Sequence, residues 1–154
     1  MIVLHDFRLS LRAVTILKDY GEPIAFNSQH ILGDSPLRGH PDIFCCLGLA
    51  MPIFAPNTPQ YIIDKLKLEN IDFRFGKTII SHKKECVSAY NVAVSQSFVI
   101  HNKRFTDAVI MENLQEKEYI HVNQSFSRCS TMVLPKDNFI TSDKGICSKL
   151  EKLY

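Results

Sequence analysis

The chain has 154 residues, the size of a single domain. Hydrophobic residues make up 45% of it and charged residues 22%, a composition that excludes wholesale disorder. The net charge of +2 is too small for a dedicated nucleic-acid binder, and no stretch of about 18 uninterrupted apolar residues indicates a membrane span.

Helix-forming and strand-forming segments alternate along the chain. Apolar residues recur at helical spacing in four segments, and each begins or ends at a residue that favours a helix end: Gly21, Thr58, Thr106 and Asp143. Short β-prone runs lie between them. In chain order we predict a helix over 11–20, a strand over 23–27, a hairpin of 43–47 with 51–55, a helix over 58–69, a strand over 71–75, a hairpin of 92–94 with 98–101, a helix over 106–116, a strand over 119–122, a hairpin of 131–134 with 139–141 and a helix over 143–153.

The order hairpin, helix, strand recurs, which predicts an internal repeat. Three helices begin near Thr58, Thr106 and Asp143, a period of roughly 40 to 48 residues that is typical of arrays and propellers. We therefore expect one α/β (α+β) domain over residues 1–154, built as a partial array of about three units.

Both ends of the predicted array are incomplete. The first helix has no full hairpin before it, and no strand follows the last helix. Unpaired strand edges favour either a second copy of the chain, and hence a homo-oligomer, or an origin in a longer ancestral domain. The alternative is an ordinary α/β sandwich that is complete as it stands.

Cysteine usage and the N-terminus indicate the compartment. The five cysteines are odd in number, two of them are adjacent, and none belongs to a CxxC pair. This pattern is typical neither of a disulfide framework nor of a structural zinc site, so we expect reduced thiols, no metal and no cofactor. The first residues show no secretory signal. These features favour a cytoplasmic protein that contacts neither nucleic acid nor membrane.

A polar loop before the first hairpin carries the first candidate site. Residues 33–42 contain two glycines, two prolines and four ionisable side chains: Asp34, Arg38, His40 and Asp42. His40 lies two residues before Asp42, an arrangement in which an imidazole can shuttle protons while the carboxylate orients it. The alternative is a solvated turn in which Asp34 acts as a cap.

Cys129 is the candidate nucleophile. We place it at the start of a strand, and we expect Arg128 beside it to lower the pKa of the thiol. A cysteine nucleophile needs a histidine brought near by the fold, and His40 and His101 are the candidates. The alternative is a thiol that only packs under the hairpin.

Asn102 and Asp107 form a third polar group near the start of the predicted helix over 106–116. A carboxylate there can hold a cationic ligand, so we expect both residues to bind substrate together with Asp34 and Arg38. The commoner role of a carboxylate such as Asp107 is to interact with the helix dipole.

Three stretches resemble an uncharacterised family of bacterial proteins, and the resemblance covers residues 30–150. The stretches are Asp34–Ile43 with Ala55-Pro56-Asn57, then Tyr90–Ala93 with Ile100-His101-Asn102 and Thr106-Asp107, and last Arg128-Cys129-Ser130 with Ile140–Ile146.

The repeated unit also resembles that of the pentein superfamily, the guanidino-modifying α/β propellers. The resemblance implies a Cys that attacks a guanidinium carbon, a His in a His-x-Asp setting that moves protons, and carboxylates that hold the substrate cation. It assigns these roles to Cys129, to His40 with Asp42, and to Asp34 or Asp107.

We therefore expect an incomplete pentein-like propeller that acts on a guanidino or amide group of a small molecule, as a hydrolase or transferase with a Cys nucleophile. The alternative is a non-catalytic module that binds a small ligand or associates with itself.

Overall fold

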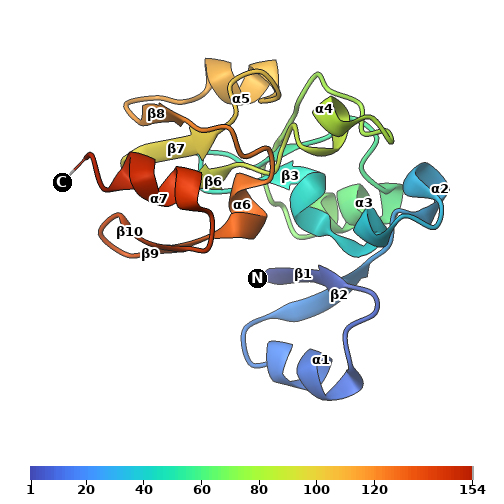
Figure 1. Cartoon of the computed structure of the whole chain (residues 1–154). Helices are drawn as coiled ribbons and strands as arrows, with labels where there is room; N and C mark the ends of the chain where they lie inside the picture. Colours follow the sequence, from blue (N-terminus) through green and yellow to red (C-terminus); the bar gives the residue numbers. More distant parts are fainter. Residues whose placement is uncertain (154) are drawn as a thin grey trace.

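The computed structural model describes residues 1–153, and Tyr154, which the predicted domain includes, lies outside them. Within the described residues the fold is mixed α+β, with short helices and four small sheets. In the view of Figure 1 the sheets follow one another in chain order around the molecule, from the blue segment at the bottom, through cyan and yellow, to orange.

The first sheet joins two parallel strands, β1 (Ile2–Asp6) and β2 (Glu22–Phe26), through helix α1 (Leu11–Leu17). The sequence pattern predicts α1 and β2 but not β1. Gly21, at the turn into β2, has a φ of +156°. A Cβ there would lie 2.4 Å from the carbonyl oxygen of Met1, so only glycine fits this turn.

Two units follow, and each has the predicted order of antiparallel hairpin, helix and parallel strand. In the first unit β4 pairs antiparallel with β3 and parallel with β5, and in the second β7 pairs in the same way with β6 and β8. The elements are β3 (Cys45–Cys46), β4 (Ile53–Phe54), α3 (Gln60–Leu68) and β5 (Arg74–Phe75), then β6 (Ala93–Val94), β7 (Phe98–His101), α5 (Ala108–Glu112) and β8 (Glu118–His121).

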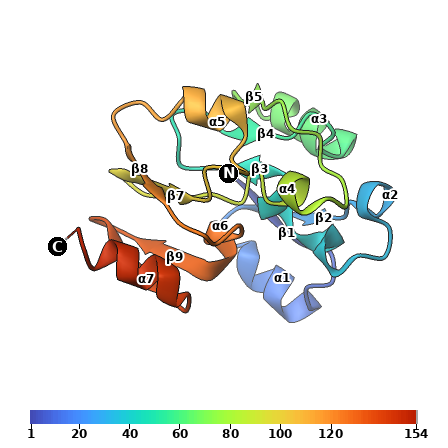
Figure 2. The same ribbon diagram turned by 45° about the horizontal axis from the view of Figure 1, so that its top comes forward.

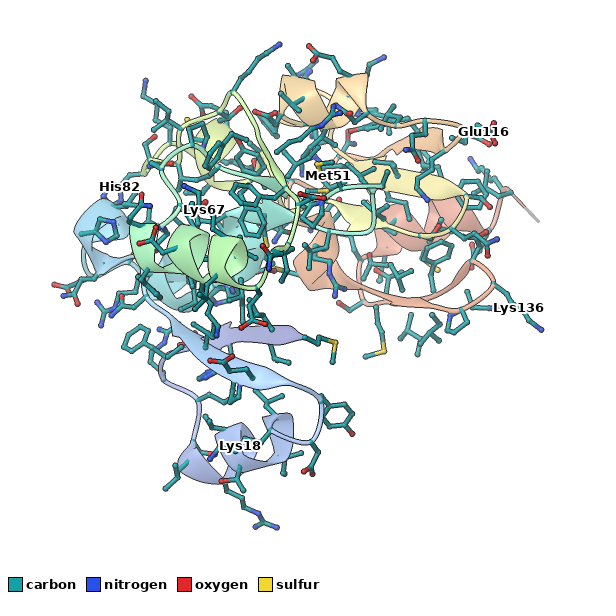
Figure 3. The ribbon with its side chains drawn as sticks, turned by 180° about the vertical axis from the view of Figure 1, so that it is seen from behind. Lys18, Met51, Lys67, His82, Glu116 and Lys136 are labelled. Atoms are coloured by element: carbon teal, nitrogen blue, oxygen red, sulfur yellow. The ribbon has the colours of Figure 1, made fainter. Side chains whose placement is uncertain are left out.

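The last hairpin joins β9 (Thr131–Leu134) to β10 (Asn138–Thr141), and helix α7 (Lys144–Leu150) follows it. Leu134 pairs with Asn138, which leaves a three-residue loop, and within it Lys136 and Asp137 turn the chain with φ values of 58° and 56°. Figure 3 shows Lys136 at the outer end of this hairpin, pointing away from the rest of the molecule.

Short helices that the sequence analysis does not predict lie in the segments that connect one sheet to the next. They are α2 (Gln29–Leu32), two 3₁₀ helices η1 (Pro36–Gly39) and η2 (Pro41–Ile43), α4 (Lys84–Val87) and α6 (Ser127–Ser130). The placement of Cys129 at the start of a strand is therefore wrong, because this residue belongs to the single turn of α6 that precedes β9.

Two hydrophobic clusters hold these elements together. The larger one includes Phe26, Phe44 and Tyr90, and the smaller one includes both Ile146 of α7 and Ile100 of β7. Figure 2 shows α7 lying alongside β9. The strands of residues 1–153 do not close into a propeller, so the propeller architecture stays a prediction.

A buried carboxylate ties the connecting segment after β5 to the start of α5. Asp107, only 1% exposed, caps α5 by accepting a hydrogen bond from the Val109 amide, at 2.8 Å. Its other oxygen accepts from the amides of Lys77 and Thr78 and from the Tyr90 hydroxyl. Burial alone would raise the pKa of Asp107, but the bonds from Thr78, Val109 and Lys77 outweigh it and lower the pKa.

We expect Asp107→Ala to destabilise the fold by roughly 2–4 kcal/mol, because three backbone amides lose their acceptor, whereas the Tyr90 hydroxyl keeps the carbonyl of Thr78. Urea denaturation at neutral pH measures the loss. Since the pKa is lowered by folding, this stabilisation is present above the ordinary aspartate pKa and disappears as the pH falls through the folded-state value.

The matched control is Asp34→Ala. Asp34 has a side chain that is 90% exposed, and its partner Arg38 lies on the same loop. The free energy of unfolding should therefore change by no more than about 0.5 kcal/mol. Equal effects of the two substitutions would contradict the structural role of Asp107.

Candidate functional site

Three connecting segments each end in a polar residue shortly before the first strand of the next hairpin. Asp42 stands three residues before β3, Asn91 two residues before β6, and Cys129 two residues before β9. The fold brings these three residues together although they come from segments 49 and 38 residues apart. They form the candidate site, together with His40.

Asn91 lies at the centre of this group. It is fully buried, and its Nδ2 donates hydrogen bonds to Oδ2 of Asp42 at 2.9 Å and to Sγ of Cys129 at 3.1 Å. Its Oδ1 accepts from the Cys129 amide at 3.2 Å. The side chain therefore fixes the positions of both chemically active groups.

The Cys129 thiol donates to Oδ2 of Asp42 at 2.8 Å. The other carboxylate oxygen of Asp42 lies 3.6 Å from Nδ1 of His40. One ligand-type atom from each of His40, Asp42 and Cys129 falls within a group no wider than 4.8 Å. The structure thus brings together the three residues that the sequence analysis proposes as catalytic.

The thiol is held in its protonated form. Partial burial of Sγ, followed by the hydrogen bond to Asp42 and the charge of that carboxylate, raises the pKa of Cys129 to about 12. The hydrogen bond from Asn91 and the charge of Arg128 lower the pKa of Cys129, but by less than the other causes raise it. The expectation that Arg128 lowers this pKa enough to favour the thiolate is therefore wrong.

The four residues predicted to bind substrate have other partners. Arg38 forms an exposed ion pair with Asp34, at 2.7 Å. Asn102 is buried and donates to the carbonyl of Asn123, and Asp107 serves the helix start described above. None of these contacts, within the described part of the chain, joins the group around Asn91.

His101, the other histidine considered for Cys129, is a structural residue. It is completely buried, and its ring nitrogens bond to the hydroxyl of Thr106 and the carbonyl of Ser125. Burial lowers the pKa of His101 to about 4, so the ring is neutral at physiological pH. Of the two candidates, His40 is the one that lies beside the thiol.

Asn91 is the site residue that is not predicted from the sequence, because its amide group neither titrates nor acts as a nucleophile. The signal that could have found it is its position: it comes just before a predicted hairpin, as Asp42 and Cys129 do.

A cavity of about 480 Å³ adjoins the group, a volume in the range of small-molecule sites. Asp42 and Arg128 supply its charged lining. Apolar side chains form much of the remaining wall, among them Val3, Leu47, Phe54, Leu66 and Ile71.

These features define a class of protein: a mixed α+β domain in which a Cys–His–Asp group lies where the connecting segments meet. A family model, described as a family of unknown function (DUF6873), matches residues 4–154, and the chain belongs to this family. The comparisons found no match among curated proteins and none among solved structures. Among residues 1–153, no helix has the length and apolar character needed to cross a membrane.

We expect Asp42→Asn to accelerate alkylation of Cys129 by iodoacetamide at pH 8. The substitution removes the negative charge that helps to raise the pKa of the thiol, and the thiolate fraction grows roughly tenfold for each pKa unit recovered. Peptide mass spectrometry measures the rate. Asp34→Asn removes a similar charge from an exposed loop and should leave the rate unchanged. A rate that stays constant in Asp42→Asn would contradict this account.

Proposed function

We propose that the chain is a pentein-like hydrolase or transferase that acts on a guanidino or amide group, with Cys129 as nucleophile. The observation that carries the proposal is the convergence of Cys129, Asp42 and His40 within 4.8 Å, from segments 87 residues apart. A thiol, a carboxylate and an imidazole in reach of one another supply the nucleophile, cation holder and proton carrier that such a reaction needs.

The fold supports the same assignment. Two complete units of hairpin, helix and parallel strand, with partial units on either side, are consistent with a pentein-like array. In such an array the connecting segments meet at one place, where the candidate site lies. The cavity beside Asp42 and Arg128 offers room for the rest of the substrate, and its apolar wall favours a substrate with an apolar body.

The chemistry begins with displacement of the thiol from Asp42. A guanidinium group that donates to Asp42 replaces the S–H donor and puts a positive charge beside the sulfur, which favours the thiolate. His40 accepts the thiol proton, the thiolate attacks the central carbon, and His40 returns the proton to the departing nitrogen.

The covalent intermediate is then resolved. The carbon is bonded to Sγ of Cys129 at this stage, and the amine has left. His40, again neutral, takes a proton from water or from an acceptor amine as it attacks the same carbon. The C–S bond breaks and the proton on His40 returns to the sulfur. Water gives a hydrolase, and an amine gives a transferase.

A non-catalytic module that binds a small ligand, or associates with itself, is the second candidate. The protonated Cys129, already satisfied by Asp42 and Asn91, favours binding without covalent chemistry. Within residues 1–153, β1 pairs only with β2 and β10 only with β9, so each has one open edge that can accept a strand from a second copy.

The decisive experiment incubates the full chain with alkylguanidines, guanidino acids and primary amides. It quantifies the released amine or ammonia and the remaining product, a urea-type compound from a guanidine or a carboxylic acid from an amide. Acid quenching followed by peptide mass spectrometry locates any adduct. We expect product formation and an adduct on Cys129, both abolished by Cys129→Ser and retained by Cys147→Ser.

Two results would count against catalysis. Ligand-induced thermal stabilisation that persists in Cys129→Ser, with no product from the native chain, would favour the binding module. A panel that yields neither product nor adduct would overturn the proposed hydrolase or transferase.

A further inference from the structure

We propose that His40, Asp42 and Cys129 form a binding site for Zn²⁺, and that the bound ion blocks the cysteine. The three side chains offer an imidazole nitrogen, a carboxylate oxygen and a sulfur, which are the ligand types that zinc takes in proteins. Magnesium and calcium prefer oxygen ligands alone, so this mixed set selects a borderline-soft ion.

The distances suit a small tetrahedral ion. With bonds of about 2.0–2.3 Å, neighbouring ligand atoms around zinc are roughly 3.3–3.8 Å apart. His40 Nδ1 and Asp42 Oδ1 already lie 3.6 Å apart. The 2.8 Å contact of Cys129 Sγ is a hydrogen bond to the other carboxylate oxygen of Asp42, Oδ2. With one ligand atom from each residue the group is no wider than 4.8 Å, so the most distant atoms draw together by about 1 Å when an ion binds.

The site is open on one side and fixed on the other. The side chains of His40 and Asp42 are 42% and 30% exposed, and Cys129 is exposed as well, so an ion has access and water can complete the coordination. Asn91 supports the set from the buried side, since its amide bonds to Asp42 and Cys129. Supporting hydrogen bonds of this kind orient metal ligands and raise affinity.

Binding and nucleophilic chemistry exclude each other at this sulfur. When the Zn–S bond forms, the thiol proton leaves to solvent, while His40 contributes the Nδ1 lone pair of its neutral ring. The sulfur electron pair that would attack a substrate carbon is then shared with the ion. The inhibition of turnover rests on the proposed function, whereas the binding site does not.

Cobalt(II) titration of the full chain tests the ligand set. We expect tetrahedral d–d bands and a near-ultraviolet sulfur-to-metal charge-transfer band in the native chain and in Cys86→Ser and Cys147→Ser. The charge-transfer band should be lost in Cys129→Ser, and binding should weaken in His40→Gln, an exposed position whose substitution leaves the core intact. Addition of Zn²⁺ should remove the bands. A charge-transfer band that persists in Cys129→Ser would overturn the proposal.

Alkylation provides a readout that needs no enzymatic activity. At Zn²⁺ concentrations ten times the dissociation constant, we expect labelling of Cys129 by iodoacetamide to fall about tenfold and to recover with EDTA, while labelling of Cys147 stays constant. Unchanged labelling of Cys129 would refute the site.

The two proposals fail separately in these experiments. Protection by Zn²⁺ without any turnover would retain the metal site and reject the enzyme. Turnover in a chain whose Cys129 is not protected by Zn²⁺ and which shows no cobalt bands would retain the enzyme and reject the metal site.

Discussion

The candidate site depends on the hydrogen bonds of one buried amide. Asn91 connects the segment before β3 to the segment before β9, with its side chain on Asp42 and Cys129 and its backbone carbonyl accepting from the Arg128 amide. An amide that is both donor and acceptor can hold a carboxylate and a thiol at once, and its burial makes each of these bonds costly to lose. The thiol therefore faces Asp42 in a defined geometry.

Two further asparagines, one in each repeated unit, hold these segments in place. Asn57 follows β4 and holds both the amide and the carbonyl of Ile80, in the segment that leads to Asn91. Asn102 follows β7 and donates to the carbonyl of Asn123, in the segment that leads to Cys129. Each complete unit thus uses the residues after its second strand to anchor the chain that carries the next site residue, so that local repetition produces a common meeting point.

Periodic features of the sequence predict the fold well, whereas a structure that rests on a single turn or a single contact leaves no period in the sequence. Apolar spacing locates the four longer helices and the hairpins, but the single turn of α6 is too short to show a period, so Cys129 is misplaced on a strand. Residue chemistry selects His40, Asp42 and Cys129, which the fold brings together. The same criterion also selects Asp107 and Asn102, because polar side chains that cap helices or hold loops look no different in sequence from side chains that bind a ligand.

In this arrangement, loss of the proton from Cys129 depends on a positive charge beside Asp42. With Asp42 accepting from the thiol, the sulfur keeps its proton, and the carboxylate itself is one of the causes of the raised pKa. A cation that engages Asp42 removes that acceptor and offsets its charge in one step, which favours release of the thiol proton. The guanidinium substrate and the zinc ion that we propose would satisfy the same requirement in different ways: the first would leave the sulfur free to attack carbon, and the second would bind the sulfur itself. Under both proposals, the chemistry of the cation that engages Asp42 decides whether the Cys129 thiolate reacts with carbon or binds a metal ion.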